Sequence, residues 1–380
     1  MYIIICVCGL LTLAYVVLML LYSIGWDKQP VFILPKSFEP VTSISIIIPA
    51  RNEANNIGAC IDSILKQQYP RSLFEIIVVD DHSTDETAAI VKGYPDKNVR
   101  CLKLSEHLRE GEILTAYKKK ALSVGIAHSK GELIITTDAD CIAPAGWLEY
   151  IVALYERDKP VMIVAPVDFT CDNSIVQTFQ SIDFMSMQGI TAAAYALGLG
   201  NMSNGANLAF SKAAFNEVNG YEGIDHLASG DDYLLMMKLK KEYPHGIAYL
   251  KSANAIVKTA PQPDWKSFFS QRIRWASKSG KYSDLVLTLI LLFVYLINFS
   301  FLVLLIAGIF NPFLLGIMGL MLVCKIVAEL YYLAPVASYF GKRKQLYIFP
   351  FLQPMHIGYI IIAGFLGFAG TYRWKGRAVK

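Results

Sequence analysis

The chain has 380 residues, of which 54% are hydrophobic and only 17% are charged. This composition is too apolar for a plain soluble enzyme or a disordered protein, so part of the chain lies in lipid. The charged residues gather between positions 27 and 281, which excludes a pure membrane bundle such as a transporter and indicates one water-soluble domain with a substantial core. The formal net charge is only +4, so no general affinity for nucleic acid follows.

Seven cysteines are scattered along the chain without a CxxC pair or a Cys/His group at zinc spacing. We therefore expect no disulfide framework and no structural zinc. A domain on the reducing, cytosolic side of a membrane fits this cysteine usage.

The first element is an apolar run over residues 2–24. It exceeds the roughly 20 residues that cross a hydrocarbon core, so residues 1–26 are predicted to form a transmembrane anchor. A signal peptide is the alternative, but the run lacks a basic start and a small-x-small cleavage site. Lys28 and Lys36 follow the run, and the positive-inside rule then places the domain in the cytoplasm and the N-terminus outside.

Residues 40–262 are predicted to form an α/β domain. Short β-branched runs predict buried strands at residues 44–48, 74–79, 99–104 and 133–137, and helical spacing follows the first, third and fourth of them. Ser83 and Glu86 have the spacing of a capping box for the helix after the second strand. Strands that alternate with helices predict a mostly parallel sheet with both faces covered, which binds ligands at the carboxyl ends of its strands.

Polar side chains follow three of these strands. They are Arg51 and Glu53, next to Ala50, after the first strand, Asp80 and Asp81 after the second, and Asp138 and Asp140 after the fourth. Carboxylates in one crevice repel one another unless a cation lies among them, and oxygen ligands suit Mg²⁺ or Mn²⁺ better than zinc. The alternative is that each aspartate caps the following helix. The same chemistry at three strand ends favours a metal and phosphate site.

Residues 263–281 are predicted to form an amphipathic segment at the membrane interface. In the string WKSFFSQRIRW at residues 265–275, aromatic side chains alternate with cations, as in helices that lie at the headgroup level. A simple lipid anchor is the alternative.

Residues 284–372 are predicted to form the C-terminal membrane region, with two to three spans and a basic tail at residues 373–380. Asn311-Pro312 supplies the turn between the first two spans. Lys325 and Glu329 are spaced to pair on one helical face, and a snorkelling pair near the interface is the alternative.

The last apolar run, residues 346–370, conflicts with the positive-inside rule. Residues 342–344 are basic and belong in the cytoplasm, so a full crossing would leave the basic tail outside. Pro350 and Pro354 are expected to break the run, and its first part would then be an interfacial or re-entrant segment.

Five strings in order resemble the membrane-embedded family 2 glycosyltransferases. They are IIIPARNEANNI (46–57), VVDDHSTDET (78–87), TTDADC (136–141), SGDD (229–232) and QRIRW (271–275). The resemblance implies a GT-A fold, a Rossmann-like domain that binds a nucleotide sugar and inverts the anomeric carbon by direct displacement. UDP is the expected carrier, because uracil is the family's commonest base.

The resemblance also assigns roles on the donor side. Ala50, Arg51 and Glu53 would line the nucleoside pocket, Asp80 and Asp81 would contact base and ribose, and Asp138 and Asp140 would hold the metal and the diphosphate. Lys118 and Lys119 occupy a stretch where the family often carries a lysine near the phosphates, and an exposed helix face over residues 118–120 is the alternative.

On the acceptor side, the resemblance places the general base at Asp232, with Asp231 where the family more often has Glu. Two acids that stabilise a helix dipole are the alternative. Asn204 and Gly205 resemble a small-residue loop where the acceptor approaches, or else form an ordinary turn. Gln271, Arg274 and Trp275 fit the QxxRW-like motif that closes over the donor.

These features together predict an integral membrane glycosyltransferase of the bacterial inner membrane, with its catalytic domain in the cytoplasm and a lipid or lipid-linked acceptor. A processive polysaccharide synthase is the alternative enzyme, and a non-catalytic membrane scaffold is the alternative from another class.

Overall fold

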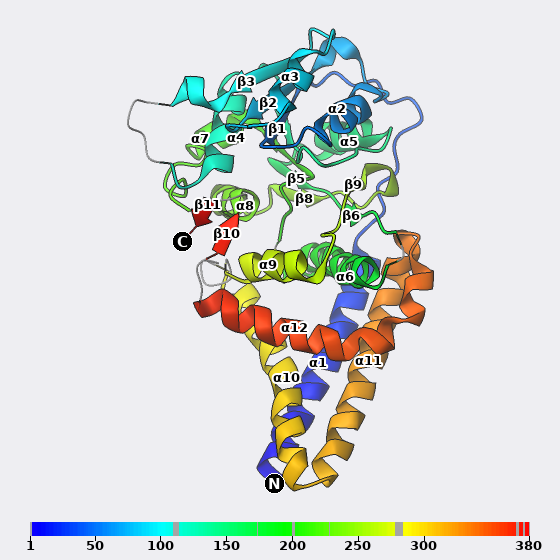
Figure 1. The fold of residues 1–380 in the computed structure, drawn as a ribbon. Coiled ribbons are helices and arrows are strands. Elements are labelled where there is room, and N and C mark those ends of the chain that lie inside the picture. The colour runs from blue at the N-terminus through cyan, green and yellow to red at the C-terminus, as the bar shows by residue number, and fades with distance from the viewer. Residues whose placement is uncertain are drawn as a thin grey trace.

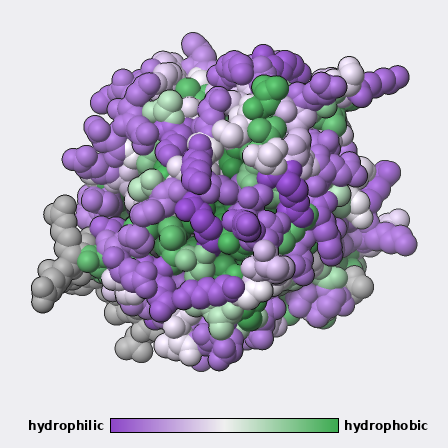
Figure 2. Space-filling model, turned by 90° about the horizontal axis from the view of Figure 1, so that it is seen from above, coloured by the Kyte–Doolittle hydropathy of each residue, from purple (hydrophilic) through white to green (hydrophobic). Residues whose placement is uncertain are grey.

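The computed structural model describes residues 2–108, 114–172, 174–199, 202–227, 229–277, 284–369, 372–374 and 377–379. A sheet domain stands on a stalk of long helices, and the face of the domain that points away from the stalk is largely hydrophilic (Figures 1 and 2).

A seven-stranded sheet forms the centre of the domain, with the order β3-β2-β1-β4-β7-β5-β8. Its strands are β1 (Ile44–Ala50), β2 (Phe74–Asp80), β3 (Val99–Lys103), β4 (Leu133–Thr136), β5 (Met162–Val164), β7 (Leu208–Ser211) and β8 (Ile247–Tyr249). β7 runs antiparallel to both of its neighbours, and the other pairings are parallel. The predicted mostly parallel α/β sheet is confirmed.

Helices cover both faces of this sheet (Figure 1). They are α2 (Ile57–Leu65), α3 (Thr87–Lys92), α4 (Tyr117–Ala127), α5 (Trp147–Asp158), α7 (Lys212–Glu217) and α8 (Asp231–Glu242). In β1 the side chain of Ile47 joins one apolar core and those of Ile46 and Ile48 join the other, because successive residues of a strand point to opposite faces.

A second layer lies between the sheet and the stalk (Figure 1). It contains α6 (Ile175–Leu197), α9 (Trp265–Ala276) and the parallel pair β6 (Val167–Phe169) and β9 (Val257–Thr259). α9 confirms the helix predicted over the WKSFFSQRIRW string, and the Asp264 carboxylate caps it by accepting from the Ser267 amide.

The stalk consists of α1 (Tyr2–Lys28), α10 (Leu285–Phe310) and α11 (Phe313–Tyr339). With α12 (Phe349–Ala369), these are the described helices long and apolar enough to cross a membrane. α10 and α11 meet at Asn311 and Pro312, the predicted turn. One apolar core runs from the sheet into the stalk, so the domain and the stalk share buried surface.

Lys325 is fully buried inside the stalk and lies 2.6 Å from Glu329. Glu329 also accepts hydrogen bonds from Tyr15 of α1 and Gln353 of α12. The predicted pairing of Lys325 and Glu329 is confirmed, and snorkelling is excluded because the ammonium group is enclosed by three helices.

α12 lies crosswise to α1, α10 and α11, beneath α9 and α6 (Figure 1). It continues through Pro350 and Pro354, so the expected break is wrong. Pro350 lies in the first turn, where its missing N–H costs no hydrogen bond. The chain end after α12 lies beside the sheet domain (Figure 1). β10 (Tyr372–Trp374) and β11 (Arg377–Val379) form a hairpin there.

The capping box predicted at Ser83 and Glu86 is also wrong. α3 begins at Thr87, and the Asp85 carboxylate accepts from the Thr87 amide at 3.1 Å. Ser83 instead accepts a hydrogen bond from the Asn52 amide at 2.9 Å and ties the loop after β2 to the loop after β1.

Candidate functional site

A cavity of about 650 Å³ lies between the carboxyl ends of the sheet strands and the α6–α9 layer. Fourteen of the sixteen residues named from the sequence line it: Ala50, Arg51, Glu53, Asp81, Lys118, Asp138, Asp140, Asn204, Gly205, Asp231, Asp232, Gln271, Arg274 and Trp275. They come from loops after three strands, from α4, α8 and α9, and from the loop before β7.

The loops after β1 and β2 form one wall of the cavity, and hydrogen bonds fix their positions. The Arg51 guanidinium donates to the backbone carbonyl of Asp81 at 3.1 Å, and the Glu53 amide donates to the Thr87 hydroxyl at 2.8 Å. Asn52 adopts a left-handed backbone with φ of 53°, which asparagine tolerates because its side chain bonds locally, here by accepting from the Thr84 amide.

Asp80 and Lys119 do not line the cavity. The Asp80 carboxylate is buried beneath the loop and accepts from the Ser83 amide at 3.3 Å. Lys119 points into the protein, where its ammonium donates to the carbonyls of Leu227 and Ser229 and holds the chain that leads into α8. Adjacent residues of a helix point about 100° apart, so only one of Lys118 and Lys119 faces the crevice.

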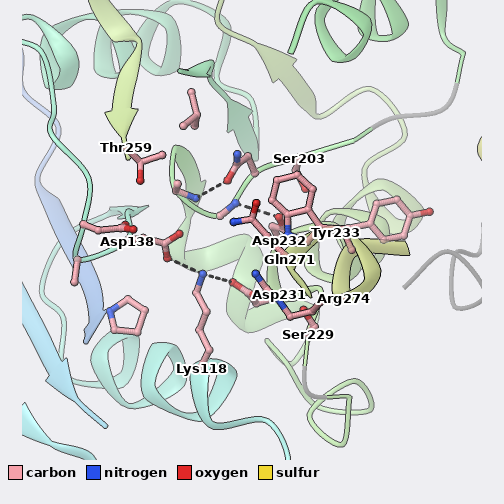
Figure 3. Close-up of a pocket in the computed structure, with 18 of the residues that line it drawn as sticks. Lys118, Asp138, Ser203, Ser229, Asp231, Asp232, Tyr233, Thr259, Gln271 and Arg274 are labelled. Carbon is pink, nitrogen blue, oxygen red and sulfur yellow. Dashed lines mark hydrogen bonds and ion pairs between the residues drawn. The ribbon is translucent and has the colours of Figure 1, made fainter. Parts of the chain in front are cut away.

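Lys118 lies at the centre of the acidic cluster (Figure 3). Its ammonium is 2.7 Å from Asp138 and 3.3 Å from Asp231, so the exposed-face alternative is wrong for this residue. Burial opposes the charge on Lys118, but the two carboxylates outweigh it and raise the pKa of the ammonium well above its ordinary value. The group is therefore a permanent cation between the DxD pair and the start of α8.

The surroundings of Asp140 disfavour its charged form. Burial, together with the charges of Asp138 and Glu53, raises the pKa of Asp140 to about 6. A carboxylate that is disfavoured by neighbouring anions gains from a divalent cation, so this corner fits Mg²⁺ or Mn²⁺. Among the described residues no three His, Cys, Asp or Glu side chains are grouped to hold a metal by themselves, so a cation here needs further ligands such as phosphate oxygens.

Two acidic residues at the start of α8 line the cavity, and their environments differ. Asp231 is buried and paired with Lys118, whereas Asp232 is half-buried and its carboxylate accepts from the Gly205 amide at 3.1 Å. Gly230 takes φ of 79° immediately before the helix, a left-handed conformation that favours glycine.

Gly205 fits closely against this pair. A β-carbon added there would lie 3.1 Å from the Asp231 carboxylate and 3.5 Å from the Lys118 ammonium. The Gly205 carbonyl accepts from the Thr136 hydroxyl at 2.9 Å, which fixes the loop to β4.

The side of the cavity nearest the stalk was missed from the sequence. It is formed by α6 through Phe184, Met187, Gln188 and Thr191, whereas Gln271 and Trp275 of α9, which line the same cavity, were named from the QRIRW string. The polar residues that interrupt the apolar run IVQTFQSIDFMSMQGITAAAYAL were a signal for a long helix with one functional face. This wall is mixed in polarity, unlike the acidic end around Asp138.

Comparisons with known proteins agree with this architecture. The model described as glycosyl transferase family 2 matches residues 45–217, and the model described as glycosyl transferase family group 2 matches residues 133–341, more than half of the chain. The mannosyltransferase PcManGT from Pyrobaculum calidifontis, solved in complex with GDP-Man and Mn²⁺, is similar in fold with a TM-score of 0.60 and 21% identity, over 96% of this chain and 99% of that one.

Two curated relatives are similar in sequence over shorter stretches. Glycosyltransferase AglE of Haloferax volcanii is 28% identical over half of this chain and 58% of its own length. The beta-monoglucosyldiacylglycerol synthase of Nostoc is 30% identical over 30% of this chain and 24% of its own length. The chain thus spans less than two thirds of either relative. On the family match, the order of its motifs and the fold, the chain belongs to glycosyltransferase family 2, the nucleotide-sugar glycosyltransferases with a GT-A fold.

Proposed function

We propose that the protein transfers one sugar from a nucleoside-diphosphate sugar to a lipid or lipid-linked acceptor at the cytoplasmic face of the membrane, with inversion at the anomeric carbon. The observation that supports this most directly is the single cavity that joins the acidic strand ends to α6 and α9. α6 packs on α1 and α11, so the acceptor end of the cavity borders the membrane helices.

The residues at the strand ends would bind the sugar donor and stabilise its leaving group. Arg51 and Asp81 would hold the nucleoside, and Lys118 would place a fixed positive charge beside the diphosphate. Asp138 and Asp140 would hold the Mg²⁺ or Mn²⁺ ion. When bound, such an ion neutralises the charge that develops on the departing nucleoside diphosphate. The basic side chains of Lys118 and Arg274 face the same cavity and stabilise that charge as well.

The acceptor half falls to Asp232. A hydroxyl is a weak nucleophile and must lose its proton as it attacks, so a carboxylate has to lie on the acceptor side of the anomeric carbon. Asp231 is engaged by Lys118, which favours Asp232 as the base. The Gly205 amide orients the Asp232 carboxylate, and the proton passes from the acceptor hydroxyl to that carboxylate.

The wall of the cavity opposite the acidic residues supports the proposal of a membrane-bound acceptor. Phe184, Met187 and Trp275 offer apolar contact close to the sugar-transfer site, and Gln188 and Gln271 offer amide groups for hydroxyls. The Nostoc relative is named as a synthase of a monoglucosylated diacylglycerol, which supports a lipid acceptor.

The test is donor and acceptor profiling with the purified full chain in nanodiscs. Panels of UDP- and GDP-sugars are supplied with membrane lipid extract, nucleoside diphosphate release is measured, and lipid products are weighed by mass spectrometry. One added sugar on a lipid supports the proposal. A ladder of products identifies a processive synthase, and no turnover of any donor identifies a non-catalytic scaffold.

A further inference from the structure

The α9 wall of the cavity is held from behind by a buried carboxylate. Gln271, Arg274 and Trp275 face the cavity, whereas Arg272 of the same helix points away and is 4% exposed. A guanidinium nitrogen of Arg272 lies 2.6 Å from Oδ2 of Asp183, in the middle of α6.

Arg272 also stacks on the aromatic ring that closes the cavity. Its guanidinium carbon lies 4.2 Å from the ring centroid of Trp275 and 5.1 Å from that of Phe268. A guanidinium held over an aromatic face fixes the ring as well as itself. The position of Trp275 is therefore tied to that of Arg272.

Asp183 collects contacts from a third helix. The Tyr359 hydroxyl of α12 donates to Oδ1 of Asp183 at 2.6 Å, and Nε2 of His356 lies 3.6 Å from the same oxygen. Burial opposes ionisation of Asp183, but Arg272, His356 and Tyr359 outweigh it and lower the pKa of the carboxyl below its ordinary value. One anion therefore joins α6, α9 and the crosswise helix α12.

The buried Asp183–Arg272 pair is not explained by stability alone, because apolar residues of similar volume hold helices together without the cost of desolvating two charges. Here the pair adds a fixed position, since the Arg272 guanidinium is held between the Asp183 carboxylate and the rings of Trp275 and Phe268. That geometry sets the rotation of α9 about its axis, which decides where Gln271 and Trp275 point.

We propose that Asp183 is a positioning residue for sugar transfer, which fixes the cavity-facing side of α9 through Arg272 and ties it to the membrane-lying helix α12. This rests on the proposed function, since α9 has a role only if the cavity binds donor and acceptor. Asp183 does not line the cavity and does not contact the reacting groups.

The test compares Asp183→Asn with a matched control, Asp168→Asn. Asp168 is a second buried aspartate, 2.5 Å from Lys342, and this pair lies outside α9. Full-chain protein labelled with 5-fluorotryptophan reports on Trp275 by ¹⁹F NMR, with the resonance assigned by its loss in Trp275→Phe. The Trp147 resonance, from a side chain bonded to Asn207 beneath the sheet, is the internal reference.

In Asp183→Asn we expect the Trp275 resonance to shift or broaden, kcat for transfer to fall roughly ten- to a hundredfold, and the KM for the donor to stay unchanged. The Trp147 resonance should not move, and Asp168→Asn should leave the Trp275 resonance and kcat as in the wild type. If Asp183→Asn does not fold, Arg272→Lys keeps the charge pair, removes the stacking, and should give the same two changes.

An unchanged Trp275 resonance in a folded variant overturns the proposal, as does an unchanged kcat. A wild-type protein that turns over no nucleotide sugar overturns the proposed function instead, while the ¹⁹F comparison still reports whether Asp183 positions α9. Asp183→Asn/Arg272→Gln should lose no more activity than the worse single variant, because both act through one contact.

Discussion

The Lys118 ammonium lies 2.7 Å from the Asp138 carboxylate and so joins α4 to the loop after β4. The same ammonium lies 3.3 Å from the Asp231 carboxylate, which connects the acidic end of the cavity to the start of α8 (Figure 3). One cation thus neutralises two acids that would otherwise repel each other.

Replacing Lys118 with methionine should weaken donor binding. The variant loses the positive charge proposed to lie beside the diphosphate and removes the cation between Asp138 and Asp231, so we expect the KM for the donor to rise on the order of ten- to a hundredfold. Initial rates over a range of donor concentrations measure it. Lys92→Met, at an exposed position at the end of α3, is the control and should behave as the wild type. An unchanged KM in Lys118→Met would contradict a role at the phosphates.

Asp232→Asn should remove the base while leaving the donor site intact. Transfer should fall by about 10² to 10⁴-fold, the usual contribution of general base catalysis. Donor affinity from calorimetry should match the wild type. Asp231→Asn is the comparison, and it should raise the KM for the donor because it breaks the contact with Lys118. If Asp231→Asn instead abolishes transfer and Asp232→Asn does not, the two roles are exchanged.

Gly205→Ala should impair activity without unfolding the protein. The added methyl group would lie 3.1 Å from the Asp231 carboxylate, tighter than an ordinary contact, so the acids at the start of α8 must move. We expect kcat/KM to fall roughly tenfold with little change in melting temperature. Gly58→Ala on α2 is the control, since its methyl group would make ordinary contacts with the Tyr94 hydroxyl at 3.7 Å and an Ile90 methyl carbon at 4.0 Å. Full activity in Gly205→Ala would show that the loop accommodates the methyl group without moving the two acids, which would contradict this prediction.

Lys325→Met should destabilise the stalk strongly. It leaves Glu329 charged and enclosed by three helices, and breaking one half of a buried pair costs about 3 to 5 kcal/mol. Thermal unfolding in detergent measures the loss. Lys325→Met/Glu329→Gln should recover much of it, because no charge is left unpaired. A double variant as unstable as the single one would mean that packing matters here more than charge.

Lys251 should make stability depend on pH. Its ammonium donates to the Trp26 carbonyl at the end of α1, and burial lowers its pKa to about 8. The unfolded side chain titrates at about pH 10.4, so between about pH 8 and pH 10 the unfolded state binds more protons and raising the pH favours folding. Melting temperatures of the wild type minus those of Lys251→Met should therefore increase from pH 7.5 to pH 9.5. A difference that is constant with pH would contradict the lowered pKa.

Much of the fold could be predicted because its signals are local. β1, β2 and β4 are apolar on both faces, and α1, α10 and α11 exceed a membrane's thickness. The three-residue strands β5 and β8 carry no such signal, since so short a run forms a strand only when a neighbour pairs with it.

The site residues also divide into those with a local sequence signal and those that depend on tertiary packing. Residues in strand-end motifs were found, because the sheet brings strand ends together wherever the chain comes from. Lys118 and Lys119 could not be told apart, since the choice between crevice and interior depends on the helix's rotation against the sheet. The sequence left open whether residues 346–370 cross the membrane, and the contacts of α12 were hidden. Gln353, His356 and Tyr359 lie on one face, and their partners are on α11 and α6.

The crosswise course of α12 keeps the two ends of the chain far apart. The start of α1 lies at the far end of the stalk, whereas the hairpin after α12 lies beside the sheet domain (Figure 1). A group joined to the hairpin therefore lies close to the sheet domain, and a group joined ahead of α1 lies far from it. The large apolar residues Phe351 and Phe365 are exposed on α12, as is expected of a helix that contacts acyl chains and not water.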